Sequence, residues 1–223
     1  MSDFPLLLGH RGARLSRGVP ENTCASFDLA LEHGCDGFEF DVRLTACGRA
    51  VVCHDPRVRG ITVSRATCDQ LKHLPQLKAV LKRYRQRAFL DIELKVRNLE
   101  SKTLTALREE PVGAGYVISS FIPDVVMELE ARSARAPLGI ICDKPSQLAR
   151  WRKLPIDYVI AHQALVDQKL IREVHAAGKK LVVWTVNNKQ TMLRLAAWGV
   201  DGIISDNTQL LVSTLGRSKP SQS

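Results

Sequence analysis

The chain repeats one pattern from end to end: a short apolar run, then a stretch whose apolar residues have helical spacing. Eight runs are candidate strands, at residues 6–9, 37–42, 88–95, 116–119, 138–141, 158–161, 180–186 and 202–205. Helical patterns lie at 23–33, 75–84, 99–109, 124–134, 146–150, 169–177 and 189–198, and a last one begins near 207. Strands that alternate with helices predict a parallel sheet covered by helices.

Eight strand–helix units are the number that closes a parallel sheet into a TIM (β/α)8 barrel. We therefore predict the α/β class and this barrel. The 223 residues lie near the short end of the range for the fold. A doubly wound open sheet is the alternative, but the chain carries no Gly-x-Gly-x-x-Gly fingerprint.

Size and composition are those of an ordinary globular protein, at 45% hydrophobic and 25% charged residues. We expect a single barrel domain over residues 1–215 and a flexible tail at 216–223, where Ser, Lys and Pro are frequent. No apolar run approaches the roughly 20 residues that span a bilayer, and no secretory signal is visible. These features predict a cytoplasmic protein without stable membrane insertion.

The cysteines show no metal-binding or redox spacing. They are Cys24, Cys35, Cys47, Cys53, Cys68 and Cys142, and none forms a Cys-x-x-Cys pair. A chain of this size does not need disulfides to fold, and we expect reduced, mostly buried thiols.

Two carboxylates, Glu39 and Asp41, alternate with apolar residues in one candidate strand. In an antiparallel sheet they would belong to a wet outer face. A parallel barrel strand has no such face, so the two carboxylates should point into the barrel while Phe38 and Phe40 face the helices. An unpaired charge there costs several kcal/mol, so the carboxylates require a cation or cationic side chains near the open end of the barrel.

A second strand repeats this arrangement with Asp91, Glu93 and Lys95. We predict a metal site formed by Glu39, Asp41 and Glu93, because oxygen ligands favour one hard divalent cation, Mg²⁺ or Ca²⁺. Asp91 lies one pleat deeper, and we expect it to partner Lys95 or another buried cation. A salt-bridge cluster centred on Lys95 is the alternative to a metal site.

Two histidines, His10 and His54, each follow an apolar run and should lie at the C-terminal end of the barrel. A histidine pair across a bound anion can serve as general base and general acid near neutral pH. Arg11 can donate two hydrogen bonds to a phosphate; pairing with Glu21 or Glu39 is the alternative.

The ordered set of these motifs resembles the glycerophosphodiester phosphodiesterase family, within the phospholipase C-like phosphodiesterase superfamily. The motifs are Gly9-His10-Arg11-Gly12, Pro20-Glu21-Asn22-Thr23, Glu39-x-Asp41-Val42, Leu44-Thr45, His54-Asp55, Glu93-x-Lys95 and Trp184-Thr185-Val186-Asn187. The resemblance extends from His10 to about Asp206. It implies a TIM barrel that hydrolyses glycerophosphodiesters to glycerol 3-phosphate and an alcohol.

The resemblance also implies a role for each matching residue. Glu39, Asp41 and Glu93 would bind the cation, and His10 and His54 would transfer protons. Arg11 and Lys95 would neutralise phosphate oxygens, while Phe121 and Trp184 would line the glycerol pocket; core packing is the alternative for both aromatic residues. Members of the family usually carry a sizeable insertion after the His-Asp motif, whereas residues 56–87 here are compact and basic.

Two other functions remain open at the level of sequence. Within the same superfamily, the chain could hydrolyse lysophospholipids or related lipids in a phospholipase D-like reaction. The net charge of +9 would also suit a binder of nucleic acid or another polyanion. That function needs exposed aromatic residues among basic ones, and the three Trp, three Tyr and six Phe mostly occupy core-like positions. We expect a small-molecule substrate and no nucleic acid; the sequence does not give the oligomeric state.

Overall fold

The main sheet of the protein closes on itself. A computed structural model describes residues 4–133 and 135–216. The closed ring consists of parallel strands β1 (Leu6–His10), β2 (Gly37–Leu44), β6 (Phe89–Leu94), β7 (Tyr116–Ser120), β8 (Leu138–Cys142), β9 (Tyr158–His162), β10 (Lys180–Trp184) and β11 (Gly202–Ser205). Because β1 pairs with both β11 and β2, the predicted barrel is confirmed and the open sheet is excluded.

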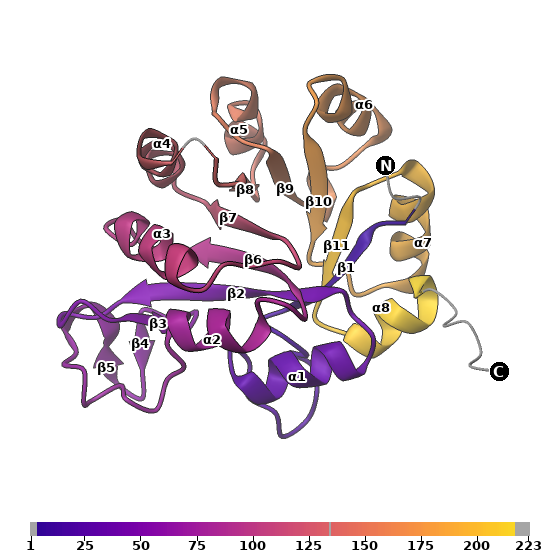
Figure 1. The fold of residues 1–223 in the computed structure, drawn as a ribbon. Helices are drawn as coiled ribbons and strands as arrows, with labels where there is room; N and C mark the ends of the chain where they lie inside the picture. The colour runs from indigo at the N-terminus through magenta and orange to yellow at the C-terminus, as the bar shows by residue number, and fades with distance from the viewer. Residues whose placement is uncertain (1–3, 134, 217–223) are drawn as a thin grey trace.

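Helices surround this ring (Figure 1). They are α1 (Cys24–Glu32), α2 (Leu77–Tyr84), α3 (Glu100–Glu109), α4 (Pro123–Arg132), α5 (Pro145–Leu148), α6 (Gln168–Ala176), α7 (Lys189–Trp198) and α8 (Thr208–Leu215). The barrel strands and these helices begin and end within two residues of the positions expected from the sequence. Residue 134 of the expected fourth helix and residues 217–223 of the expected tail lie outside the described residues. The described helices include none long and apolar enough to cross a membrane.

The side chains of β2 alternate between the helices and the barrel interior. Phe38 stacks on Phe27 of α1, with ring centroids 4.2 Å apart, and meets Tyr84 of α2 edge-on at 5.0 Å. Glu39 and Asp41 alternate with the helix-facing residues and therefore point inward. The barrel beneath them is filled by a separate apolar cluster: Leu8, Phe89, Val117, Ile141, Tyr158, Ile160, Val182 and Ile204. This cluster confines the carboxylates to the C-terminal end of the barrel.

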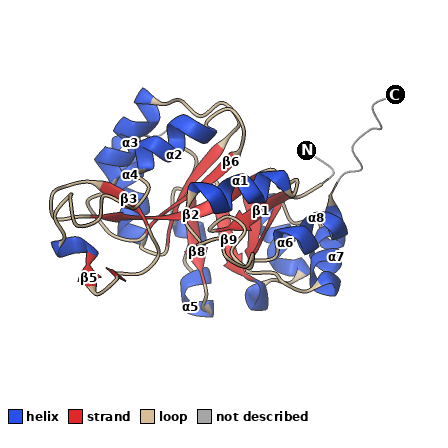
Figure 2. Ribbon diagram, turned by 90° about the horizontal axis from the view of Figure 1, so that it is seen from below, coloured by secondary structure: helices blue, strands red, loops and turns tan. Residues whose placement is uncertain are grey.

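Three short strands of the described residues lie outside the ring, and the first of them, β3 (Ala50–Val52), runs antiparallel to β2. Residues 53–75 then form an excursion, which we call the insertion, with the hairpin β4 (Arg57–Val58) and β5 (Ile61–Thr62) and a 3-10 turn at 63–65. The insertion and β3 share a small core of Val51, Cys53, Val63, Ala66 and Leu71. In Figures 1 and 2 the hairpin projects at one edge of the barrel, toward which the arrow of β2 points.

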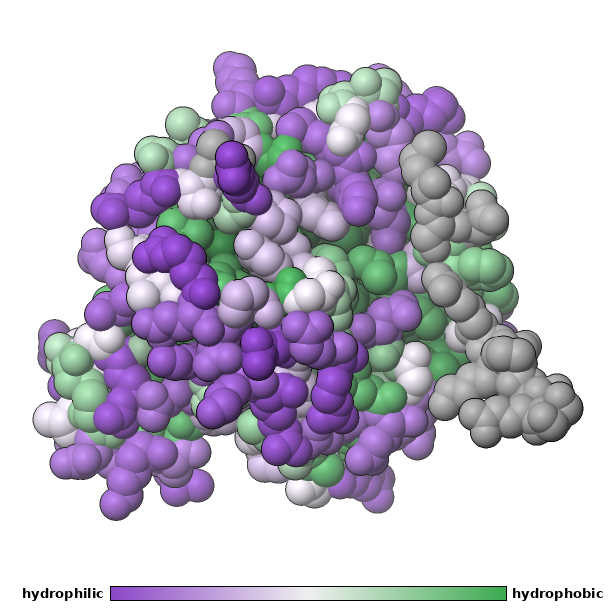
Figure 3. All heavy atoms as spheres, in the orientation of Figure 1, coloured by the Kyte–Doolittle hydropathy of each residue, from purple (hydrophilic) through white to green (hydrophobic). Residues whose placement is uncertain are grey.

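The outer surface is mostly polar. Figure 3 shows one face of the molecule, where hydrophilic residues predominate and hydrophobic residues form small groups between them. Among the described residues, the large hydrophobic side chains that are exposed are Phe4, Leu15, Met127 and Leu193. They belong to the N-terminal segment, the β1–α1 loop, α4 and α7, so they come from four separate parts of the chain.

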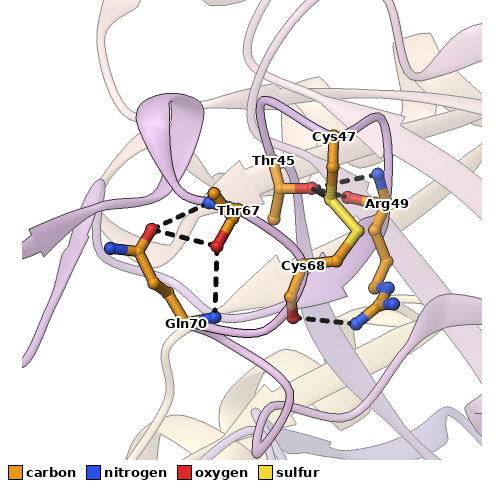
Figure 4. The surroundings of a disulfide bond; sticks show 6 residues. All are labelled: Thr45, Cys47, Arg49, Thr67, Cys68 and Gln70. Atoms are coloured by element: carbon orange, nitrogen blue, oxygen red, sulfur yellow. Dashed lines mark hydrogen bonds between the residues drawn. A yellow bond between two sulfur atoms is a disulfide. The ribbon is translucent and has the colours of Figure 1, made fainter.

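A disulfide joins Cys47, in the β2–β3 turn, to Cys68, in the insertion (Figure 4). The Cα atoms are 5.8 Å apart, and the two residues are 21 positions apart in the sequence. Neighbouring groups hold the same two segments together, since a guanidinium nitrogen of Arg49 donates to the Cys68 carbonyl at 2.9 Å. The expectation that all six cysteines are reduced is therefore wrong for this pair, because folding of the insertion brings together residues whose spacing gives no signal. The remaining cysteines are free thiols: Cys24, Cys35, Cys53 and Cys142.

We predict that the double substitution Cys47→Ser and Cys68→Ser lowers the free energy of unfolding by about 3 kcal/mol, because the cross-link no longer restricts the unfolded chain. Urea unfolding followed by circular dichroism measures the change. Dithiothreitol should destabilise the unsubstituted protein by a similar amount and leave the double variant unchanged. The prediction would be contradicted if the unsubstituted protein had the same free energy of unfolding with and without dithiothreitol.

Candidate active site

Three buried carboxylates meet at the C-terminal end of the barrel. Glu39 and Asp41 come from β2 and Glu93 from β6, where Asp41 and Glu93 are direct neighbours in register. One oxygen of each lies within 4.8 Å of the others. Glu39 Oε1 is buried and has no hydrogen-bond partner among the described residues. Converging oxygens of this kind fit a hard divalent cation such as Mg²⁺ or Ca²⁺.

The electrostatics of the cluster favour the binding of a positive charge. Burial, together with Asp41 and Glu93, raises the pKa of Glu39 well above its ordinary value. Burial and the Asp41 charge raise the pKa of Glu93 to about 7. Burial also opposes the ionisation of Asp41, but Lys95 and Arg11 outweigh it and lower its pKa. Without a cation, the site therefore favours one ionised carboxylate over three.

Lys95 bridges two of these carboxylates. Its Nζ lies 2.7 Å from Glu93 Oε1 and 3.3 Å from Asp41 Oδ1. Burial opposes the charge of this amine, but the attraction of Glu93 and Asp41 raises its pKa above the ordinary value. The salt-bridge cluster that the sequence offered as an alternative is thus present. It leaves Glu39 Oε1 without a partner, so it does not replace a cation.

Asp91 lies deeper in the barrel, opposite Glu39 in the register of β2 and β6. The Ser119 hydroxyl of β7 donates a hydrogen bond to its Oδ1 at 2.5 Å. Burial raises the pKa of Asp91 to about 7. The sequence suggested a cationic partner for Asp91. The structure instead provides the Ser119 hydroxyl, whose hydrogen bond a protonated carboxyl can also accept.

The β1–α1 turn brings Arg11 to the same cluster. Its backbone N–H donates to Glu39 Oε2 at 2.9 Å, and its Nε lies 3.3 Å from Asp41 Oδ2. Arg11 has φ of +52°, a left-handed conformation that is uncommon outside glycine and marks a strained turn. The guanidinium also donates to Glu21 at 2.8 Å, the pairing foreseen as an alternative. The turn therefore supplies a fixed N–H and a cation to the carboxylate cluster.

His10 is held by a residue from the last strand–helix connection. Its Nδ1 lies 2.7 Å from Asp206 Oδ1, and its Nε2 lies 3.8 Å from Glu39 Oε2. Burial opposes the ionisation of Asp206, but hydrogen bonds from His10 and Asn187 outweigh it and lower its pKa. An Nδ1–H that donates to Asp206 leaves the lone pair on Nε2, which faces the carboxylates.

His54 follows β3 and is close enough to the cluster for the charge of Asp41 to act on its imidazole. Its Nδ1 is 2.8 Å from Asp55 Oδ1, and Arg43 Nε donates to its backbone carbonyl at 2.6 Å. Burial lowers the pKa of the His54 imidazole, although the Asp55 hydrogen bond and the Asp41 charge oppose this shift. Both histidines are thus anchored through Nδ1 by a carboxylate, and both leave Nε2 for chemistry.

Two aromatic residues meet beside Lys95. The rings of Phe121, which follows β7, and Trp184, at the end of β10, have centroids 5.6 Å apart in an edge-to-face contact. Lys95 Nζ lies 5.5 Å from the Phe121 centroid, and His162 contacts Trp184 from the other side at 5.5 Å. The rings are only partly buried and pack on the interior cluster, so they can present an apolar wall at the barrel opening.

Sequence analysis missed the residues that hold the catalytic candidates. Asp206 anchors His10, and Asn187 donates to Asp206 at 2.7 Å. Asn22 donates to Asp41 Oδ2 at 2.8 Å from within the Pro-Glu-Asn-Thr motif. The position of Asp206 directly after the last strand was an available signal, because strand ends converge at the site.

The comparisons with known proteins agree with this geometry. The model of the glycerophosphoryl diester phosphodiesterase family matches residues 10–210. A putative glycerophosphodiester phosphodiesterase of Bacillus subtilis is 30% identical over 92% of this chain and 96% of its own. A glycerophosphodiester phosphodiesterase of Caldanaerobacter subterraneus is also 30% identical, over 93% and 96%. An Oleispira antarctica phosphodiesterase, solved with the product sn-glycerol-3-phosphate, has a TM-score of 0.84 and 25% identity over 97% of this chain and 98% of that one. The chain belongs to the glycerophosphoryl diester phosphodiesterase family.

Proposed function

We propose that the protein hydrolyses glycerophosphodiesters to glycerol 3-phosphate and an alcohol, with a divalent cation and two histidines. The observation that carries this proposal is the cluster of three buried carboxylates between two histidines that are both anchored through Nδ1. Family membership and the product complex of the Oleispira antarctica phosphodiesterase support the choice of substrate.

Glu39, Asp41 and Glu93 would hold the cation, Mg²⁺ or Ca²⁺. Their buried oxygens and raised pKa values fit this role, since a bound cation favours the ionised form of each. When bound, such a cation withdraws charge from phosphoryl oxygens and lowers the pKa of a coordinated hydroxyl group. Asn22 keeps Asp41 in position through its hydrogen bond at 2.8 Å.

Arg11 and Lys95 would bind the phosphate. Both cations already face Asp41, at 3.3 Å each, so a phosphate above that carboxylate meets positive charge on two sides. Fixed donors of this kind stabilise charge that develops on phosphoryl oxygens. Phe121 and Trp184 would pack against the glycerol carbon atoms.

His10 would act as the base and His54 as the acid. With Nδ1–H directed at Asp206, His10 Nε2 can accept a proton from the attacking hydroxyl group. His54 would donate a proton to the leaving alkoxide. Burial lowers the pKa of His54, and a bound phosphodiester opposes this effect because its negative charge favours the imidazolium.

Phospholipase D-like hydrolysis of lipids receives less support. A lipid substrate would favour a hydrophobic surface around the barrel opening. Of the large hydrophobic side chains that are exposed among the described residues, only Leu15 belongs to a loop at the C-terminal end of a barrel strand next to the site. Apart from Phe121 and Trp184, the residues around the carboxylate cluster are charged.

The proposed activity is tested with a panel of glycerophosphodiesters assayed with Mg²⁺, with Ca²⁺ and with EDTA. We expect release of glycerol 3-phosphate with at least one cation and none with EDTA. Turnover that persists in EDTA would refute the metal dependence, and no turnover on any diester would refute the activity.

We predict that His10→Ala and His54→Ala each reduce turnover by about 10²- to 10⁴-fold, the usual contribution of a general acid or base. Steady-state kinetics measures the loss, and the melting temperature checks that each variant is folded. His175→Ala, a histidine on α6 that pairs with Asp201, is the control and should retain turnover. Near-normal turnover in His10→Ala or His54→Ala would contradict the role of that residue.

The raised carboxyl pKa values predict how pH affects the metal-free protein. Asp91 and Glu93 titrate at about 7 in the folded state, against ordinary values of 3.8 and 4.5. Between these values the folded protein binds more protons than the unfolded chain, so the free energy of unfolding falls as pH rises from about 4.5 to 7. The lowered pKa of Asp41 and of Asp206 acts below this window. The lowered pKa of His54 acts within it and in the opposite direction, but it is one group against the raised carboxyl groups of Glu39, Asp91 and Glu93.

In EDTA, the melting temperature should therefore be higher at about pH 5.5 than at about pH 7.5. Mg²⁺ or Ca²⁺ should raise it more at the higher pH, because the ligands bind a cation only when deprotonated. Differential scanning fluorimetry measures both effects, with Glu93→Gln as a variant that should lose most of the cation response. Equal stabilisation by the cation at the two pH values would contradict the prediction.

A further inference from the structure

A cavity of about 250 Å³ lies between β2, the insertion and the β6–α3 loop. Its lining consists of residues 43–45, Pro56, residues 63–64 and residues 96–98. We call it the flank pocket. Arg43 lies two residues beyond Asp41 on the same face of β2, and Arg97 follows Lys95 by two residues. The flank pocket therefore borders the chain segments that directly follow Asp41 and Lys95, and Arg43 connects it to the backbone of His54.

The flank pocket is positively charged. Arg43 and Arg97 are its charged lining residues, and no carboxylate lines it among the described residues. Arg43 is half-buried, and its Nε donates to the His54 carbonyl at 2.6 Å, but it forms no ion pair with any described residue. Arg97 pairs with Asp124 across an exposed surface, where such a pair contributes little. A half-buried guanidinium without a counter-charge favours an anionic ligand.

The position of the flank pocket determines which part of a substrate could enter it. Under the proposed function, which this inference requires, glycerol packs on Phe121 and Trp184 and the phosphate lies at Lys95 and Arg11. The leaving alcohol then extends toward His54, the residue that would protonate it. Beyond His54 this alcohol meets the flank pocket, where Ser64 and Asn98 can also form hydrogen bonds.

We propose that the flank pocket binds the alcohol headgroup of the substrate and selects headgroups that carry a carboxylate or a phosphate over those that carry a quaternary ammonium. Arg43 and Arg97 attract the anionic group, and a choline headgroup is repelled by the same two charges. The exposed arginines of the insertion, Arg57, Arg59 and Arg65, add positive charge to this side of the molecule.

The test compares glycerophosphoserine with glycerophosphocholine, and kcat/KM is measured for each with Mg²⁺ or Ca²⁺. We expect glycerophosphoserine to be the better substrate of the unsubstituted protein. Arg97→Glu reverses one charge of the flank pocket without touching the catalytic residues, and Arg97→Met removes it. Arg97→Glu should shift the ratio of the two kcat/KM values by about tenfold toward choline, as expected for two charges separated by a few ångströms near a surface.

Arg172→Glu is the matched control, since it makes the same charge change on α6, on the far side of the barrel from the insertion in Figure 1. It should leave the ratio unchanged. The inference would be overturned if neither Arg97→Glu nor Arg97→Met changed the ratio of the two kcat/KM values, or if the unsubstituted protein preferred glycerophosphocholine. Either result would leave the proposed activity intact. Failure to hydrolyse either diester, or any other in the panel, would refute the proposed activity itself and the inference with it.

Discussion

Four carboxylates, Glu39, Asp41, Asp91 and Glu93, lie inside the barrel, and their burial constrains the residues around them. An isolated buried charge costs several kcal/mol, so the neighbouring positions carry Lys95, Arg11, Asn22 and Ser119. These partners do not satisfy every oxygen, as Glu39 Oε1 shows. The protein thus keeps an incompletely neutralised cluster that could hold a divalent cation.

The same constraint orders the residues that would carry out proton transfer. His10 and His54 come from different parts of the chain, one from the first barrel strand and one from beyond β3. Each is oriented by a carboxylate on Nδ1, Asp206 or Asp55. Asp206 is largely buried and bound by Asn187, whereas Asp55 is exposed. The orientation of His10 is therefore fixed more firmly than that of His54, which suits a base that must hold one geometry and an acid that must meet different alcohols.

The regular part of the fold was predictable from sequence because the pattern of each strand and helix is local. The inward direction of Glu39 and Glu93 followed from the alternation of strand side chains once a parallel barrel was assumed. The Cys47–Cys68 disulfide and the flank pocket were not predictable, because both depend on how an irregular insertion folds back on the barrel. The Asp206 contact was missed for a related reason: it joins residues 196 positions apart, and the position of Asp206 after the last strand places it at the site without indicating its partner.

The insertion leaves the barrel and returns to it at nearly the same point. The Val52 N–H donates to the Pro75 carbonyl at 2.8 Å, and Val51 bridges to Gln76. A segment whose two ends are already in contact can change in length or sequence at little cost to the barrel, because the closure entropy grows slowly with loop length. The insertion supplies one wall of the flank pocket, with Pro56, Val63 and Ser64. This wall could change in shape without rebuilding the metal site, whereas Arg43 and Arg97 each lie two residues from a proposed site residue and are tied to that site.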